Sequence, residues 1–451
     1  MIENISKEST IQEIVRQGLC IGCGTCITMC PEKALILQES QESGIYLPRL
    51  DPSKCIHCGV CHLVCPGIEA DFNKLNFIAF DQKSKYAFLG NYLSCYSGYA
   101  TDQNLRAKST SGGLISALAI FALETGLVDG VLTTRANLKK PLKPYSFIAK
   151  TKQEVLSAIG SKYCPISTNS ALDKILKKQG RYIVIGLPCH IQGIRKAQAL
   201  NKELKNRISL IFGMVCNHTP TFHAINFLLK KFKIRTEHIV KLDYRSNGWP
   251  GGIKIVMDNG SKYVIPFSSS YYWGYVFQKF FWPKRCMICN DKLCQLADII
   301  FMDAWLPEFS FDKIGHSLIV VRSIKGKNFL TEAIKKDVLK LQPISIEQVL
   351  QSQVLSKTIQ KVIARRLILR YPSKDPFVFK QFLPSSSILD LLDAFHLVLI
   401  HQICKKTSKM TLIIIEFHVG MWDFARVAKR TIIKFKTLFL TFKKRFRNFI
   451  K

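Results

Sequence analysis

Between about residues 76 and 370, short apolar runs alternate with segments whose apolar residues recur every three or four positions. The short runs are rich in β-branched residues, which predicts buried strands, and the periodic segments predict helices between them. The clearest runs lie at 182–185, 208–215 and 317–321. This alternation predicts a mixed α/β body, in the range from α/β to α+β.

Two local signals refine this picture. The tripeptide Asp258-Asn259-Gly260 separates two alternating segments, and Asn-Gly readily adopts the positive φ angles of a type I′ hairpin turn. The sheet is therefore expected to contain antiparallel strands. A proline- and serine-containing stretch at 371–387 predicts a linker, and a basic, apolar tail follows at 388–451.

Charge separates the chain into modules. The 451 residues include 65 Lys and Arg against 32 Asp and Glu, a net charge of +33, whereas residues 1–75 are slightly acidic. An apolar content of 47% excludes a disordered or fibrous chain. The start of the sequence lacks the pattern of a signal peptide, so the 16 cysteines indicate metal or redox chemistry in a reducing, cytoplasmic compartment.

Half of the cysteines form two runs with the spacing C-x2-C-x2-C-x3-C, each followed by proline, and this spacing is typical of bacterial two-cluster ferredoxins. In such domains each run gives three thiolates to one 4Fe-4S cluster and its fourth to the other. The alternatives are structural zinc or inert thiols. The first cluster is therefore expected to bind Cys20, Cys23, Cys26 and Cys65, and the second Cys55, Cys58, Cys61 and Cys30. Residues 1–75 are predicted to be a small ferredoxin-like domain.

Six more cysteines lie between residues 164 and 294. Cys189 follows the first of two predicted neighbouring strands and Cys216 ends the second, so a β-α-β unit would bring both to the carboxyl edge of one sheet. Cys286 and Cys289 form a C-x2-C pair before the predicted strand at 298–302. These four thiolates are predicted to hold a third 4Fe-4S cluster, with zinc as the alternative. Cys294 is a competing ligand, and the isolated Cys95, Cys164 and Cys404 are expected to be buried thiols.

The segment Thr110-Ser111-Gly112-Gly113 precedes an apolar helical run at 114–123. A glycine-rich helix start can offer free amides and the positive end of the helix dipole to an anion. Serine and glycine are also ordinary helix-start residues, so simple capping is the alternative.

Between about residues 94 and 323, eight short motifs follow one another in a specific order: Ser109–Gly113, Gly160–Tyr163, Gly186–His190, Cys216–Pro220, Tyr244–Trp249, Cys286–Cys289, Ala297–Ile299 and Asp303–Trp305. In these motifs and their order the chain resembles the beta-subunit family of coenzyme F420 hydrogenases and dehydrogenases, whose bacterial relatives often carry a ferredoxin head. Met302, where a glycine is usual, and His190, where glutamine is common, depart from the family pattern.

The resemblance implies an FAD-binding iron-sulfur oxidoreductase for residues 76–370, which exchanges electrons between a hydride donor or acceptor and the clusters. It implies that Thr110, Ser111, Gly112 and Gly113 meet the FAD phosphates. It also implies that Lys162 and Arg245 supply positive charge near the flavin, although both residues are equally compatible with a solvated surface. A redox partner protein or a small hydride carrier is the expected partner. The alternative class is an iron-sulfur binding or scaffold protein without flavin catalysis.

In the tail, apolar residues recur every three or four positions between Phe424 and Ile450, with lysines and arginines largely outside that face. Such a helix can lie on an anionic membrane surface, which would make the protein peripheral on the inner face of the membrane. Docking on the body is the alternative, and nucleic acid is disfavoured because no reading motif accompanies the charge. No apolar run is long enough to predict a spanning helix.

Overall fold

The computed structural model describes residues 10–371 apart from 69 and 275, and residues 388–403, 413–421 and 423–424. Its centre is an eight-stranded sheet in which β4, β6, β7 and β11 run parallel and the other four strands pair antiparallel. The mixed α/β class and the three predicted buried strands are confirmed. In spatial order the strands are β13 (Leu339–Pro343), β3 (Ser94–Ala100), β12 (Ser317–Val321), β11 (Ile299–Asp303), β7 (Ile208–Met214), β6 (Tyr182–Gly186), β4 (Gly130–Arg135) and β5 (Tyr145–Ala149).

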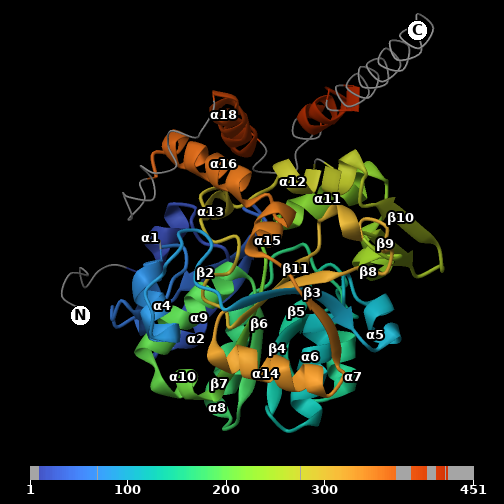
Figure 1. The fold of residues 1–451 in the computed structure, drawn as a ribbon. Coiled ribbons are helices and arrows are strands. Elements are labelled where there is room, and N and C mark those ends of the chain that lie inside the picture. Colours follow the sequence, from blue (N-terminus) through green and yellow to red (C-terminus); the bar gives the residue numbers. More distant parts are fainter. Residues whose placement is uncertain are drawn as a thin grey trace, which may run out of the picture.

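Helices cover both faces of this sheet (Figure 1). Strand β6 shows why, because Ile183 and Ile185 pack into one apolar core while Tyr182 and Val184 pack into the other. The first core is covered by α5 (Gln103–Lys108), α6 (Leu114–Glu124), α7 (Lys152–Ser157) and α14 (Ile324–Lys335). The second is covered by α4 (Phe72–Phe80), α8 (Leu172–Lys177), α9 (Pro188–Leu200), α10 (Lys202–Arg207), α15 (Ile346–Ser352) and α16 (Leu355–Ile368).

A smaller antiparallel sheet consists of β8 (Ile239–Ser246), β9 (Gly252–Met257) and β10 (Lys262–Pro266). The predicted hairpin is the β9–β10 connection, and Gly260 has a φ of +81° there. A third apolar core joins this sheet to α11 (Phe222–Lys231) and α12 (Val276–Lys279).

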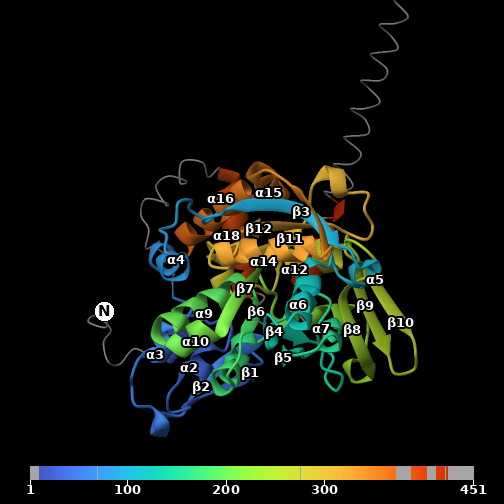
Figure 2. The ribbon, with the colours of Figure 1, turned by 60° about the horizontal axis from the view of Figure 1, so that its bottom comes forward.

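The cysteine-rich head contains α1 (Ile11–Arg16), α2 (Thr25–Met29), the antiparallel pair β1 (Leu35–Ser40) and β2 (Ile45–Leu50), and α3 (Val60–Leu63). Helix α4 spans the expected boundary at residue 75. The head lies against α9, as Figure 2 shows.

The head and the body are joined by a buried polar contact. The Asn169 side chain donates to Thr25 Oγ1 at 2.8 Å and to the His190 backbone oxygen at 2.8 Å. The backbone N–H of Asn169 donates to the Cys23 oxygen at 2.9 Å. Because these buried bonds join the Cys23 loop and α2 of the head to Asn169 and α9 of the body, they hold the head in one orientation.

At the end of the chain, α18 (Ile388–Ile403) packs on α16. A further helix covers 413–421. The predicted linker, apart from Tyr371, and residues 425–451 of the predicted tail helix lie outside the described residues. No helix in the described ranges has the length and apolarity that crossing a bilayer requires.

Gly193 on α9 allows close contact between head and body. A Cβ at this position would lie 2.4 Å from Thr25 Oγ1. We therefore expect Gly193→Ala to lower the stability by about 1–2 kcal/mol, because overpacking of this size exceeds the helix-propensity gain of up to about 1 kcal/mol. Thermal unfolding under anaerobic conditions measures the change. The matched control is Gly420→Ala, where no described residue lies within 4 Å of the new Cβ; equal melting temperatures for the two variants would contradict the proposed close fit.

Candidate functional site

The carboxyl ends of the parallel strands β6, β7 and β11 meet at one edge of the large sheet. Cys189 and Cys216 follow directly after β6 and β7, and Asp303 is the last residue of β11. A single cavity of about 810 Å³ opens at this edge. It is lined by most of the residues that the sequence singled out in the body, namely Thr110, Ser111, Gly113, Lys162, Cys189, Cys216, Arg245, Cys286 and Cys289.

The four central cysteine thiols lie close enough to influence one another. Burial raises the pKa of Cys189 well above its ordinary value, and the thiols of Cys216, Cys286 and Cys289 raise it further. Burial likewise raises the pKa of Cys216, with added repulsion from Cys286 and Cys289. The two strand ends and the C-x2-C pair at α13 (Lys284–Met287) are therefore brought to one place, as the sequence predicted.

The remaining body cysteines differ in their surroundings. Cys294 is fully buried in an apolar core and faces Gly213, where an added Cβ would lie 2.6 Å from its sulfur. Cys294 does not line the cavity. Cys164 is buried at the cavity wall, and Cys95 is buried in β3. Cys404 lies outside the described residues.

In the head, the eight thiols divide between two small cavities. The first cavity is lined by Cys20, Cys23, Cys26 and Cys65, and the second by Cys30, Cys55, Cys58 and Cys61. Each cavity therefore takes three cysteines from one run and the fourth from the other run, which is the exchange that the spacing predicts. Among the described residues, no group of three or more His, Cys, Asp or Glu side chains has an arrangement that could hold a single metal ion.

Backbone amides donate to three of the head sulfurs. The N–H groups of Gly22, Ala34 and Gly67 reach Cys20, Cys30 and Cys65 at 3.4, 3.3 and 3.3 Å. Gly22 has a φ of +67°, and an added Cβ would lie 2.5 Å from the Tyr46 oxygen. N–H donors of this kind stabilise negative charge on sulfur, so the surroundings of these thiols suit an anionic iron-sulfur cluster.

The thiol groups form a continuous series from the cavity to the surface. The Cys23 thiol contributes to the raised pKa of Cys189, after burial and the three neighbouring central thiols. Burial raises the pKa of Cys26, and Cys61 of the second head cavity adds to this effect. Cys58, in that second cavity, is exposed to solvent. The three groups of four thiols are thus neighbours in the order body, first head cavity, second head cavity.

Two cations, the half-buried Lys196 and the buried Arg285, lie at the junction of head and body. Lys196 Nζ donates to the Cys65 backbone oxygen at 2.7 Å, and Arg285 Nε donates to the Pro66 oxygen at 3.1 Å. Burial lowers the pKa of Arg285, but Cys289, Tyr371, Cys189 and Cys286 together outweigh this effect, so the pKa is raised. These cations offset negative charge on the surrounding sulfurs.

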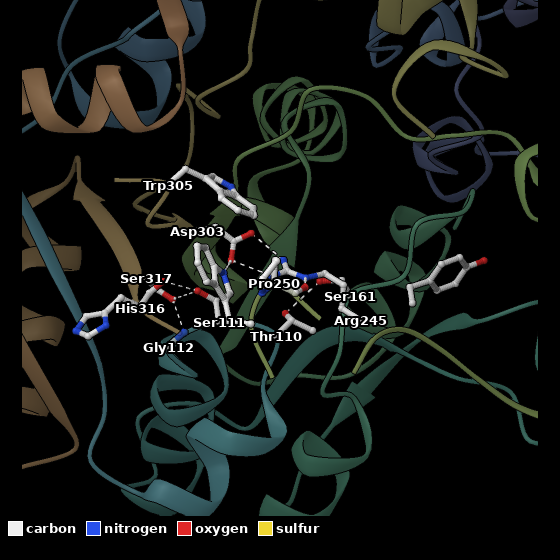
Figure 3. A network of polar contacts seen from close by, with 12 residues as sticks. Thr110, Ser111, Gly112, Ser161, Arg245, Pro250, Asp303, Trp305, His316 and Ser317 are labelled. Carbon is white, nitrogen blue, oxygen red and sulfur yellow. Dashed lines mark hydrogen bonds and ion pairs between the residues drawn. The ribbon is translucent and has the colours of Figure 1, made fainter. Parts of the chain in front are cut away.

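Figure 3 shows that residues of the segment Thr110–Gly113 form hydrogen bonds with neighbouring segments. Thr110 Oγ1 lies 3.1 Å from Ser161 Oγ, and Ser111 Oγ donates to the His316 oxygen at 2.6 Å. The Gly112 N–H donates to Ser317 Oγ at 3.0 Å. The expectation that this helix start offers free amides is therefore wrong for Gly112, because β12 lies beside it and uses that N–H.

Lys162 lines the cavity with its ammonium group bound to backbone. Its Nζ donates to the oxygens of Ala158 at 2.5 Å and Gly160 at 2.8 Å. Burial lowers the pKa of Lys162 to about 8, and Cys164 and Asp243 oppose this shift. The amine is consequently protonated at neutral pH but close to its titration range, which an ordinary surface lysine is not.

Arg245 forms a buried ion pair with Asp303, drawn in Figure 3. The Nη1–Oδ2 distance is 2.8 Å, and Arg245 Nε donates to the Pro250 oxygen at 2.9 Å. Burial lowers the pKa of Arg245, but Asp303 and Tyr163 outweigh it and the pKa is raised. Trp249 Nε1 also donates to Asp303 at 3.2 Å. Arg245 is only 7% exposed, which excludes the solvated-surface alternative.

A row of stacked rings on the cavity wall was missed by sequence reasoning. Its five members come from separated segments, and no regular spacing links them in the sequence. Ring centroids are 5.8 Å apart for Trp305 and Phe267, 5.2 Å for Phe267 and Trp273, 6.0 Å for Trp273 and His218, and 3.9 Å for His218 and Trp282. Burial lowers the pKa of His218 to about 3, so its ring is neutral.

Comparison with known proteins places these features in context. Residues 95–173 and 179–347 match the family described as coenzyme F420 hydrogenase/dehydrogenase, beta subunit, in its N-terminal and C-terminal parts. Residues 19–67 match the 4Fe-4S dicluster domain. The head is therefore an iron-sulfur domain.

Several curated relatives align with the chain. The coenzyme F420 hydrogenase subunit beta of Methanothermobacter thermautotrophicus is 24% identical over 292 residues, which are 62% of this chain and 96% of that protein. The coenzyme F420-dependent sulfite reductase of Methanocaldococcus jannaschii is 25% identical over 80% of this chain and 52% of its own length. A chain of the F420-reducing NiFe hydrogenase complex from Methanosarcina barkeri is 21% identical, with a TM-score of 0.49, over 62% of this chain and 94% of that chain.

The buried pair of Arg245 and Asp303 gives a stability prediction. Asp303→Asn leaves the guanidinium without its counter-charge, and we expect the free energy of unfolding to fall by about 3–5 kcal/mol. Chemical denaturation under anaerobic conditions measures this loss. The double variant Arg245→Met with Asp303→Asn removes both charges and should lose less than the single variant. A single variant as stable as the parent protein would contradict the importance of the pair.

Proposed function

The chain belongs to the coenzyme F420 hydrogenase/dehydrogenase beta-subunit family and carries a 4Fe-4S dicluster domain, and from this premise we propose that it is an FAD-dependent iron-sulfur oxidoreductase. When bound, the flavin would exchange two electrons with a hydride donor or acceptor and single electrons with the clusters. The expected partner is a small hydride carrier or a redox protein, in keeping with relatives that are subunits of hydrogenases by name.

The observation that carries this proposal is the series of neighbouring thiol groups that begins in the wall of the large cavity. In the body, Cys189, Cys216, Cys286 and Cys289 would hold a third 4Fe-4S cluster. In the head, Cys20, Cys23, Cys26 and Cys65 would hold one cluster, and Cys30, Cys55, Cys58 and Cys61 the other. The pairs Cys189–Cys23 and Cys26–Cys61 interact electrostatically, which supports short steps between the three sites. The exposed Cys58 marks the end at which a redox protein would dock.

The cavity suits a dinucleotide-sized cofactor. Its volume of about 810 Å³ lies within the range of about 300–1,000 Å³ that is typical of ligand sites. Thr110, Ser111 and Gly113 line the end next to the start of α6, where phosphate groups would benefit from the helix dipole. Gly112 does not line the cavity, and its amide is bound to Ser317. It would therefore hold the phosphate-binding segment in place rather than contact the phosphates itself.

Lys162 and Arg245 would be the charged groups nearest the reacting ring. Lys162 holds its proton at Nζ between two backbone oxygens and can direct it toward a ligand oxygen or nitrogen in the cavity. Arg245 has its charge balanced by Asp303 and thus orients a ligand by hydrogen bonding rather than by net charge. The stacked rings beside them exclude water from this part of the cavity.

Iron and flavin content test the proposal. We expect the anaerobically purified chain to contain about twelve irons, for three clusters, and about one FAD. Cys189→Ser removes one proposed ligand of the body cluster and should lower the iron content to about eight, with the head clusters retained. Iron and acid-labile sulfide analysis, together with flavin absorbance, measure these contents.

The matched control is Cys95→Ser, because this thiol is buried in β3 and does not line any of the three thiol-lined cavities. Its iron content should stay at the parent value. Unchanged iron in the Cys189 variant would refute the third cluster. A chain that contains clusters but never retains FAD would favour the alternative function, an iron-sulfur binding or scaffold protein.

We further propose that the C-terminal helices bring the enzyme to an anionic membrane surface. Helix α18 packs on the body through Ala394, Leu397 and Val398, whereas Leu392 and Phe395 are each 58% exposed. The helix at 413–421 is anchored through Glu416, which accepts from Tyr271 at 2.8 Å and pairs with Lys231 at 2.8 Å. Its outward residues Ile413, Phe417 and Met421 are 64%, 66% and 56% exposed.

The basic residues that follow these helices in the sequence also favour an anionic membrane surface. Residues 425–451 contain ten Lys and Arg and no Asp or Glu. Exposed apolar side chains next to a purely basic segment are the combination that binds the interface of an anionic bilayer. The predicted tail helix up to Ile450 belongs to this segment and lies outside the described residues. The cytoplasmic location stays a prediction.

Vesicle binding tests the membrane proposal. The full chain should bind phosphatidylserine vesicles, more weakly as salt rises, because the attraction is screened over about 8 Å at physiological ionic strength. The double variant Phe395→Glu with Phe417→Glu should bind at least about tenfold more weakly, since burial of each apolar side chain contributes about 1.5–3 kcal/mol. Co-sedimentation measures the bound fraction.

The matched control adds the same charge elsewhere. Leu200→Glu with Ile334→Glu changes two exposed residues at the ends of α9 and α14, far from α18 in Figure 1. This control should bind like the parent chain. Equal binding by both double variants would show that the basic residues alone meet the membrane. Strong duplex DNA binding without vesicle binding would favour nucleic acid instead.

A further inference from the structure

The large cavity continues beyond the central thiols into a second end beneath α16 and α18. This second end is lined by Lys279 of α12, Lys361 and Arg365 of α16, and Asp393 and Leu397 of α18. Both α16 and α18 lie after residue 347, where the match to the family ends. The second end is therefore built largely by helices that the shared family region does not contain.

Positive charge exceeds negative charge at this second end. Lys279 Nζ lies 2.9 Å from Asp393 Oδ1, and Lys361 Nζ lies 3.1 Å from Asp393 Oδ2. One carboxylate thus bridges two ammonium groups, and Arg365 adds a third cation. Among the described residues that line this end, three cations face one carboxylate, so this lining is short of negative charge.

Arg365 is the least satisfied of these groups. It is 7% exposed, and its Nε has no hydrogen-bond partner in the part of the chain that the structure describes. Its guanidinium carbon lies 5.2 Å from the centre of the Trp282 ring, which contacts one face of the group but accepts no conventional hydrogen bond. A buried N–H without an acceptor is costly, so a ligand atom that accepts from Nε would be favoured.

This excess charge is not explained by the nearby thiols. The groups that act on Arg285 are Cys289, Tyr371, Cys189 and Cys286, and Lys292 is influenced by Cys216. Arg365, in contrast, interacts electrostatically with Asp393. The counter-charges of the thiol sites are therefore Arg285 and Lys292, and Arg365 stays available for another anion.

We propose that the second end of the cavity binds the oxyanion group, carboxylate or phosphate, of a ligand that displaces Asp393 from between Lys279 and Lys361. Arg365 and the two lysines are donors that suit such a group. The row of rings from Trp282 through His218 and Trp273 to Phe267 connects this end to the part of the cavity beside Arg245, whose guanidinium carbon lies 5.6 Å from the centre of the Phe267 ring. The bound anion would accordingly lie within the same cavity as the proposed flavin without requiring it.

Variants of Asp393 and Lys361 should change phosphate affinity in opposite directions. We expect Asp393→Asn to bind inorganic phosphate about tenfold more tightly than the parent protein, because the competing carboxylate is removed while the cations remain. Lys361→Gln should bind phosphate about tenfold more weakly. Both side chains are partly exposed, at 26% and 33%, so the variants are expected to fold. Calorimetric titration of the cluster-containing protein at constant ionic strength, with sodium chloride as the blank, measures the affinities.

The matched control is Lys335→Gln on α14, whose ammonium group pairs with Glu332 on the exposed surface. It removes the same charge from the chain and should leave phosphate affinity unchanged. Unchanged or weaker binding of both phosphate and acetate by the Asp393 variant, or an equal loss in the Lys335 and Lys361 variants, would overturn the site in favour of diffuse attraction to a basic protein. Acetate serves as a second probe, and tighter binding of acetate alone in the Asp393 variant would assign a carboxylate ligand. Iron and flavin contents are measured on the same samples, so failure here is distinguishable from failure of the proposed redox function.

Discussion

The parallel pairing of β6, β7 and β11 is the constraint on which the rest of the structure depends. Neighbouring parallel strands end at the same edge of the sheet, so Cys189, Cys216 and Asp303 are brought together although they are far apart in the chain. Both faces of these strands are buried, which fixes their register and hence the positions of the residues that follow them. The loops beyond the strand ends are free of this packing and form the cavity.

The cavity and the neighbouring junction of head and body hold several charged groups, and most of these charges have a specific compensation. Asp303 balances Arg245 within an ion pair, and backbone oxygens surround the ammonium group of Lys162. Arg285 and Lys196 lie beside the cysteines at the junction of head and body. Buried charges without partners would destabilise the fold, so these contacts are as important for stability as for the chemistry of the site. Arg365 Nε and Arg285 Nη1 are exceptions, because neither finds an acceptor among the described residues.

The contact between head and body determines how the redox groups are related. Asn169 links the Cys23 loop to the start of α9, and α9 itself begins beside Cys189. One short polar contact thus sets both the orientation of the head and the proximity of its first thiol group to the central thiols. Gly193 allows this approach, since a side chain there would meet Thr25. An electron-transfer role for the series depends on this rigid docking, because transfer between clusters requires short distances that do not vary.

The sequence by itself determined the features that depend on local spacing. The two C-x2-C-x2-C-x3-C runs predicted the division of eight thiols between two cavities, Asn259-Gly260 predicted the β9–β10 hairpin, and the apolar runs predicted the strands before Cys189 and Cys216. Only the tertiary structure decided which partners meet across long separations. It placed Cys294 in the apolar core, used the Gly112 amide for Ser317, paired Arg245 with Asp303, and gathered five rings and three cations around one cavity. The physical reason is that turns and strands are encoded by neighbouring residues, whereas these contacts arise from the order in which distant strands and helices pack, and no periodicity along the chain records that order.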